Sequence, residues 1–209
     1  MSKEIEKRFK NFDYKTIKAL FEKNGVKKAG GELFKVSSFF PVRENQMVRT
    51  RTEGDKITMT IKTKKPGEYD TEWEVNISNQ EMMDSILEQL NIRKKYTLYK
   101  FREMYETKNG DTKIIFDHFP GLPPYMEVES DTEEHLRATI SMLDLKEEEH
   151  FTAKGLYYEH YGIPTNRKDE DLSFENAYEK LEGYITNNKD KFIEILNHQQ
   201  EFLKKKIKE

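Results

Sequence analysis

Ionisable residues recur two positions apart in this sequence, and this spacing constrains the fold more than any other feature. In an extended strand, residues i and i+2 lie on the same face. The alternate positions are mostly apolar, as at Ile61, Phe101 and Val128. The pattern predicts strands with one charged and one apolar face. It occurs in six segments: Glu4/Glu6/Arg8, Arg49/Arg51, Lys62/Lys64, Glu72/Glu74, Lys100/Arg102 and Glu127/Glu129.

The repetition of charged pairs argues against an ordinary half-exposed sheet. A strand with one solvated face is common, and it explains any single pair. Like charges at positions i and i+2 lie about 7 Å apart and repel by about 2–3 kcal/mol at an effective dielectric constant of 20. Closing the sheet would gather these charges around a bound ion or ligand. We therefore predict an α+β fold built on a closed eight-stranded antiparallel β-barrel, with a charged interior and flanking helices.

Capping signals predict helices between the strands. Asp13 can cap a helix that ends at Gly25. Ser78, followed three residues later by Glu81, resembles a capping box. A last helical stretch is expected from about 173 to 207, where apolar residues recur on one side.

Two turn signals predict hairpins. Glu53-Gly54-Asp55 separates two strand patterns. Asn109-Gly110 joins the strands expected over 96–106 and 112–119, and Asn-Gly is a strong hairpin signal.

Composition limits the classes of function. The 209 residues carry a net charge of −3, which gives no general attraction to nucleic acid. The chain has no cysteine, so oxygen or imidazole would have to hold any metal, and its five histidines lack metal-ligand spacing. No apolar run approaches the roughly 18 residues of a membrane span, and the start lacks the apolar stretch of a secretory signal. We expect a cytoplasmic protein without a membrane partner.

Charged motifs follow one another in a fixed order along the chain: Glu4 to Arg8, Arg49-Thr50-Arg51 (R-x-R), Lys62, Glu72-Trp73-Glu74 (E-x-E), Lys100-Phe101-Arg102 (K-x-R), Asp117, and Gly121 to Glu129 (G-x-x-x-x-x-E-x-E). This ordered set resembles the CYTH family of triphosphate tunnel enzymes across residues 1 to about 160. Two departures are an arginine, Arg8, where the family's opening E-x-E-x-K has lysine, and the segment from Phe34 to Phe40, which lacks the usual aspartate and tyrosine pattern.

The resemblance implies a Mg²⁺- or Mn²⁺-dependent site with three groups of residues. In hydrolytic members, residues at the positions of Glu72 and Glu74 orient or deprotonate the attacking water. Triphosphate binding is implied for Arg8, Arg49, Arg51, Lys62, Lys100 and Arg102. Metal binding is implied for Glu4, Glu6, Asp117, Glu127 and Glu129.

The family resemblance leaves several functions open. The first hypothesis is a triphosphatase acting on tripolyphosphate or on nucleoside or organic triphosphates. The second is a class IV adenylate cyclase that forms cyclic AMP and pyrophosphate from ATP. An RNA 5′-triphosphate end is a weaker substrate candidate, and a triphosphate- or polyphosphate-binding module without turnover is the non-enzymatic alternative.

We expect two parts along the chain. Residues 1–160 form the tunnel domain, and residues 161–209 form a helical extension that packs on the tunnel, closes one of its mouths or mediates a homodimer.

Overall fold

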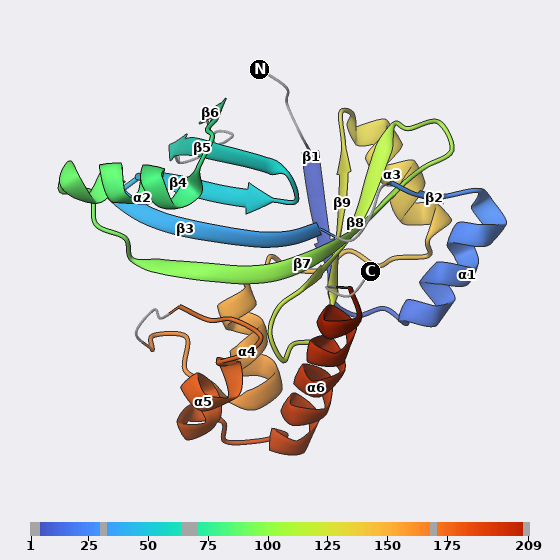
Figure 1. The fold of residues 1–209 in the computed structure, drawn as a ribbon. Coiled ribbons are helices and arrows are strands. Elements are labelled where there is room, and N and C mark those ends of the chain that lie inside the picture. Colours follow the sequence, from blue (N-terminus) through green and yellow to red (C-terminus); the bar gives the residue numbers. More distant parts are fainter. Residues whose placement is uncertain (1–4, 30–32, 64–70, 168–170, 207–209) are drawn as a thin grey trace.

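The computed structural model describes residues 5–29, 33–63, 71–167 and 171–206 (Figure 1). Glu4 and Lys64 of the sequence pattern lie outside these residues. The strands are β1 (Ile5–Phe9), β2 (Lys27–Lys28), β3 (Leu33–Arg43), β4 (Gln46–Glu53), β5 (Lys56–Thr63), β6 (Thr71–Asn76), β7 (Tyr96–Glu106), β8 (Thr112–His118) and β9 (Tyr125–Ser130). The helices are α1 (Tyr14–Asn24), α2 (Gln80–Gln89), α3 (Glu133–Met142), α4 (Ala153–Tyr161), α5 (Ala177–Leu181) and α6 (Lys189–Lys206), with a 3₁₀ turn at Glu182–Tyr184.

The nine described strands form one antiparallel sheet that is open. The order is β1-β9-β8-β7-β3-β4-β5-β6, with β2 paired to β7. Within the described ranges, β1 pairs only with β9 and β6 only with β5, so the sheet has two free ends. The prediction of a closed eight-stranded barrel is therefore wrong. Alternation decides which residues share a face, but closure depends on the tilt and stagger summed over all strands.

The open sheet is nevertheless strongly bent. The long strands β3 and β7 cross the molecule, and the β1–β9–β8 part stands steeply against the β3–β4–β5 part (Figure 1). Cross-strand pairing puts the charged residues on one face: Arg8 lies opposite Glu127, and Lys62 opposite Glu72. The bend makes this charged face concave.

Helices cover most of the other face. Helices α1 and α3 pack on β1, β8 and β9 around Phe21, Phe116 and Leu136. Helix α2 packs on β3 and β4 through Leu87. Trp73 and Val75 of β6 also point away from the charged face, but they are 56% and 55% exposed, so no described residue covers them fully. Among the described residues, the apolar face of β6 is therefore left partly open to solvent.

The predicted ends of the first helix are confirmed, but two other helix predictions are wrong. Asp13 caps α1 by accepting the N–H of Thr16, and Gly25 ends it at a φ of 69°. Helix α2 is capped by Asn79, one residue after the predicted Ser78, because the Asn79 amide oxygen accepts the N–H of Met82.

The helix predicted from about 173 to 207 is divided into α5, the 3₁₀ turn and α6. Between the last two, the Thr186 N–H donates to the carbonyl of Tyr161 instead of continuing the helical ladder. No sequence pattern predicts this tertiary hydrogen bond. Apolar periodicity alone therefore predicts one continuous helix where the structure has two.

The last three helices pack under β7 (Figure 1). They share one apolar cluster with the strands, which includes Phe101, Leu122, Tyr161, Phe192 and Leu196. Backbone pairing adds to this contact, because Leu172 lies beside Leu98 of β7 in a parallel bridge.

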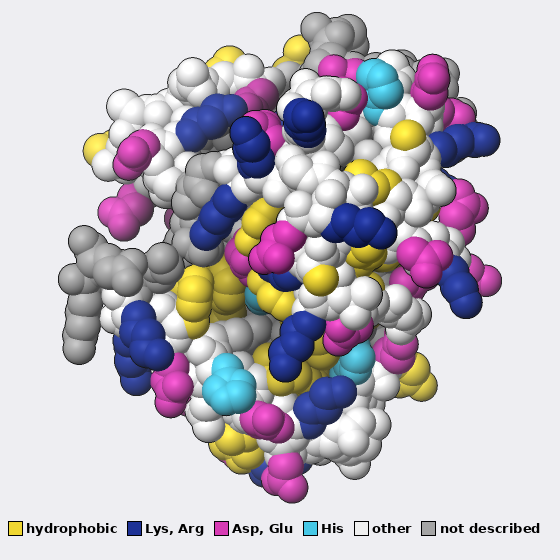
Figure 2. Space-filling view, turned by 90° about the vertical axis from the view of Figure 1, so that its right-hand side faces the viewer, with side chains coloured by type: hydrophobic (Ala, Val, Ile, Leu, Met, Phe, Trp, Pro, Cys, Tyr) yellow, Lys and Arg dark blue, Asp and Glu magenta, His cyan; other side chains and the backbone are white. Residues whose placement is uncertain are grey.

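One face of the outer surface carries mixed charge. On the face shown in Figure 2, Lys and Arg side chains alternate with Asp and Glu, and no patch of a single sign stands out. No helix within the described ranges combines the length and apolar character needed to cross a bilayer.

Candidate functional site

The concave face holds a cavity of about 600 Å³, here called the site cavity. Strands β1 and β4 to β9 all contribute to its wall, and eight cationic and seven acidic side chains line it. The ionisable lining residues are Glu6, Arg8, Arg49, Arg51, Glu53, Lys56, Lys62, Glu72, Glu74, Lys100, Arg102, Glu106, Lys113, Glu127 and Glu129. The two signs are nearly balanced, so local grouping decides what the cavity can bind.

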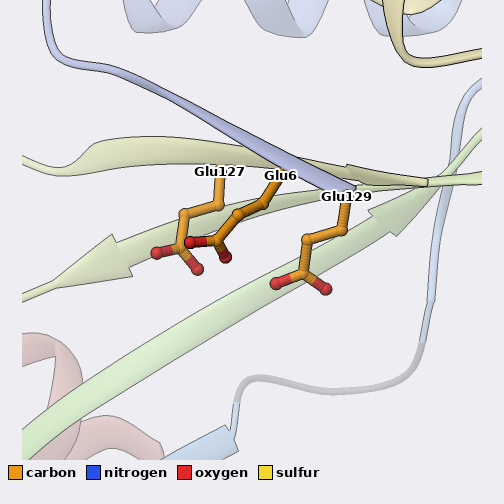
Figure 3. Close-up of side chains that lie close together, drawn as sticks. All are labelled: Glu6, Glu127 and Glu129. Atoms are coloured by element: carbon orange, nitrogen blue, oxygen red, sulfur yellow. The ribbon is translucent and has the colours of Figure 1, made fainter. Parts of the chain in front are cut away.

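Three carboxylates gather on the β1–β9 wall. Glu6, Glu127 and Glu129 each offer an oxygen, and these oxygens lie within 4.8 Å of one another. Figure 3 shows the three side chains leaving β1 and β9 on the same side. Oxygen-only donors of this kind suit Mg²⁺ or Mn²⁺. The described residues thus bring together three of the five predicted metal ligands.

Asp117 does not belong to this carboxylate group. Its side chain is fully buried and accepts hydrogen bonds from Lys100 and from both Nε and Nη2 of Arg102, the latter two at 2.7 Å. Burial alone would raise the pKa of Asp117, but the two cations hold it below its ordinary value. Asp117 therefore orients two predicted triphosphate-binding residues from beneath the cavity surface.

Two arginines partly neutralise the carboxylate group. Arg8 Nε lies 2.9 Å from Glu127, and its Nη2 donates to Glu6 at 3.0 Å. Arg102 Nη2 donates to Glu127 at 2.8 Å. Burial opposes the charged form of Arg8, but Glu127 and Glu6 outweigh it and raise the pKa of Arg8. Carboxylate and guanidinium groups therefore form one connected network at this wall.

Arg49 and Arg51 present positive charge on the opposite wall. Burial, and next the charge of Arg51, lower the pKa of Arg49 to about 10. The Nε atoms of both arginines are buried without a hydrogen-bond partner in the described chain. Arg51 reaches Glu53 only at 3.4 Å, and Arg49 forms no ion pair with a described residue. An anion with several oxygens would supply the missing acceptors.

Each of the two predicted catalytic carboxylates is paired with a lysine. Glu72 lies 2.9 Å from Lys62, and Glu74 lies 2.9 Å from Lys56. Glu74 also accepts a hydrogen bond from Thr60 at 3.0 Å. Burial opposes ionisation of Glu74, but the bonds from Lys56 and Thr60 outweigh it and lower the pKa.

The sequence interpretation missed several residues that line the cavity. Tyr125 donates its hydroxyl hydrogen to Asp117 at 3.3 Å, and Glu53 and Lys56 flank the first hairpin turn. A signal was present, because Tyr125 and Glu53 continue the i, i+2 series of their strands. Lys113 and Glu106 face each other across β7 and β8 at the other end of the cavity.

The CYTH domain family model matches residues 3–155, and the chain belongs to this family. No curated protein matches the chain in sequence.

Solved structures share the fold at low sequence identity. The PH1012 protein from Pyrococcus horikoshii OT3 is 20% identical with a TM-score of 0.58, over 69% of this chain and 92% of that chain. A putative adenylate cyclase from Vibrio parahaemolyticus is 16% identical with a TM-score of 0.61, over 73% and 96%. A putative adenylyl cyclase from Hippeastrum, described as having a dominant triphosphatase activity, is 15% identical with a TM-score of 0.51, over 76% and 95%.

Proposed function

We propose that the protein is a metal-dependent triphosphatase that hydrolyses tripolyphosphate or the triphosphate group of a nucleotide or another organic molecule. The observation that carries this proposal is the pairing of two groups in one cavity. A carboxylate group suited to a hard cation lies on one wall, and buried arginine Nε atoms without acceptors lie on the other. Phosphoryl transfer depends mainly on positioning and charge neutralisation, which this arrangement supplies.

In this proposal, Glu6, Glu127 and Glu129 hold the metal ion. Mg²⁺ or Mn²⁺ bound there would polarise phosphoryl oxygens. The cations Arg8, Arg49, Arg51, Lys62, Lys100 and Arg102 would bind the triphosphate oxygens. Asp117 would act by holding Lys100 and Arg102 in place, because its own oxygens already accept their hydrogen bonds.

Glu74 is the better supported of the two residues proposed to act on water. Its lowered pKa keeps it ionised at neutral pH, so it can accept a hydrogen bond from a water molecule and orient that molecule. Glu72 lies on the same face two residues away, opposite Lys62. The family membership supports a triphosphate substrate, and the Hippeastrum protein with dominant triphosphatase activity supports hydrolysis.

The test is product analysis with Mg²⁺ or Mn²⁺, using tripolyphosphate and ATP in separate reactions. We expect orthophosphate release that is lost in Glu127→Gln and kept in Glu106→Gln, which removes a cavity carboxylate outside the group of three. Cyclic AMP with pyrophosphate from ATP would overturn hydrolysis in favour of a cyclase. Tight triphosphate binding without any product would indicate a binding module without turnover.

A further inference from the structure

The turn between β8 and β9 is held by a side chain from the last helix. Gln199 of α6 is 6% exposed. Its Oε1 accepts the N–H of Gly121 at 2.8 Å, and its Nε2 donates to the carbonyls of Phe119 and Leu122 at 3.0 and 3.1 Å. One buried amide therefore satisfies three backbone groups of a single turn, an arrangement that fixes the turn because each group is costly to leave unpaired.

Two tyrosines of α4 complete this contact. The Tyr157 hydroxyl donates to the carbonyl of Pro120 at 2.6 Å, and the Tyr161 hydroxyl donates to the carbonyl of Gly121 at 2.5 Å. Both rings are buried. Gln199 and both tyrosines lie beyond residue 155, where the family match ends.

The residues on either side of this turn belong to the site. Asp117, at the end of β8, pairs across the strands with Tyr125, at the start of β9. The Tyr125 hydroxyl donates to Asp117, while the Tyr125 ring packs on Phe119 and Phe151, two residues that do not line the cavity. A shift of the turn would therefore move Asp117, and with it Lys100.

Helix α6 and the segment that precedes α5 also contact β7 between its two site cations. Phe101 lies on the outer face between Lys100 and Arg102 in sequence and is 5% exposed. Its ring stacks on Phe202 of α6 at 5.1 Å and packs on Phe174 at 5.7 Å. The backbone that carries both cations is thus supported on the face of the sheet opposite the site cavity.

We infer that the C-terminal helices brace the β7–β8–β9 wall of the site cavity, and that Gln199 is a positioning residue for Asp117, Lys100 and Arg102. This inference rests on the proposed function, because it assigns those cations to triphosphate binding. Among the described residues, these helices contribute no side chain to the wall of the site cavity, and they act through the turn and through Phe101.

The test is calorimetric binding of tripolyphosphate in metal-free buffer, well below the melting temperature of each variant. Gln199→Leu removes the three hydrogen bonds, and we expect it to weaken binding at least fivefold. Tyr161→Phe removes one bond and keeps the ring, so we expect a two- to threefold loss. The matched control is Gln200→Leu, which removes a hydrogen bond from α6 to the Phe174 carbonyl but none to the turn. We expect its affinity to stay within twofold of wild type.

A purely structural role predicts a different result. Gln199→Leu would then lower the melting temperature without changing affinity, and that outcome would overturn the positioning role while leaving the proposed function intact. If the wild-type protein binds tripolyphosphate neither in this buffer nor with Mg²⁺ added, the proposed function and the positioning role both fail. Should Gln199→Leu not fold, the comparison of Tyr161→Phe with Gln200→Leu decides in the same way.

Discussion

Arg51 lies two residues from Arg49 on the same face of β4, and its charge adds to the effect of burial in lowering the pKa of Arg49 to about 10. The fold therefore keeps two like charges together at a cost. A bound polyanion would remove the repulsion and supply acceptors for the buried Nε atoms.

Replacing Arg51 should separate binding from stability. We expect Arg51→Ala to weaken tripolyphosphate binding about 10- to 100-fold, the loss of a charge-assisted hydrogen bond of about 1.5–3 kcal/mol. The free energy of unfolding should stay level or rise, because the repulsion with Arg49 disappears. Calorimetry and chemical denaturation measure the two effects, with the exposed Arg93→Ala as control. Unchanged affinity would contradict the assignment of Arg51 to the substrate.

Replacing Glu129 should weaken metal binding. Glu129→Gln removes one of three carboxylate charges at the proposed site, and we expect Mn²⁺ affinity to fall about 10- to 100-fold. Titration with Mn²⁺ in the absence of substrate measures this directly. Glu106→Gln serves as the control, and an equal loss in both variants would argue against a discrete site at the three carboxylates.

Glu74 should determine how the rate of hydrolysis falls at acidic pH. Its pKa lies below the ordinary value of 4.5, so its carboxylate stays ionised at neutral pH and is protonated only as the pH falls below that value. We expect Glu74→Gln to lower kcat at least tenfold at pH 7 with little change in KM, because the proposed role is to orient water. Steady-state kinetics over pH tests this. A variant that raises KM alone would make Glu74 a binding residue instead.

Glu103 should stabilise the fold in a pH-dependent way. It lies outside the site cavity and accepts hydrogen bonds from Tyr14 at 2.8 Å and Lys18 at 3.2 Å, with His118 Nε2 at 2.9 Å. Burial opposes ionisation, but His118, Tyr14 and Lys18 outweigh it and lower the pKa from 4.5 to about 2. A lowered carboxyl pKa contributes stability that is complete above about pH 5 and is lost as the pH falls towards 2.

The corresponding variant is Glu103→Gln. At pH 7 we expect it to be less stable than wild type by about 1–3 kcal/mol, and the difference should shrink as the pH falls from 5 towards 2. Denaturant unfolding at several pH values gives the measurement, with the exposed Glu134→Gln as control. A difference that does not depend on pH would mean that packing, and not charge, explains the loss.

Gly121 should tolerate no side chain. Its φ is +73°, and an added Cβ would lie 2.4 Å from the ring of Phe192. We expect Gly121→Ala to cost about 3 kcal/mol or more, from backbone strain and overpacking together. Gly110→Ala is the matched control, because Gly110 has a φ of +72° with open space around it and should cost only about 1–2 kcal/mol. An equal loss of unfolding free energy in the two variants, measured with denaturant, would show that Phe192 moves aside for the added methyl group.

Much of the local structure could be predicted from the sequence. The hairpin at Asn109-Gly110, the cap at Asp13 and the stop at Gly25 depend on neighbouring residues in the chain, and the structure confirms them. The cap at Asn79 was missed by one residue, because Ser78 and Asn79 are both good caps and only the backbone geometry selects one.

Part of the candidate site could also be predicted. The i, i+2 spacing identified thirteen residues, and eleven of them line the site cavity. The spacing did not predict the partners of Asp117. It lies beneath the wall in contact with Lys100 and Arg102, since its place depends on strands that are neighbours only in the folded sheet.

The sequence by itself determined which side chains share a face, because alternation along a strand is a local property of the backbone. It also determined the family, through the order of the charged motifs. Only the tertiary structure decided that the sheet stays open between β1 and β6, that Arg49 faces no carboxylate at ion-pair distance in the described residues, and that Gln199 reaches the turn at Gly121. These features depend on strand tilt and on contacts across nearly 80 residues of chain, and no local pattern encodes them.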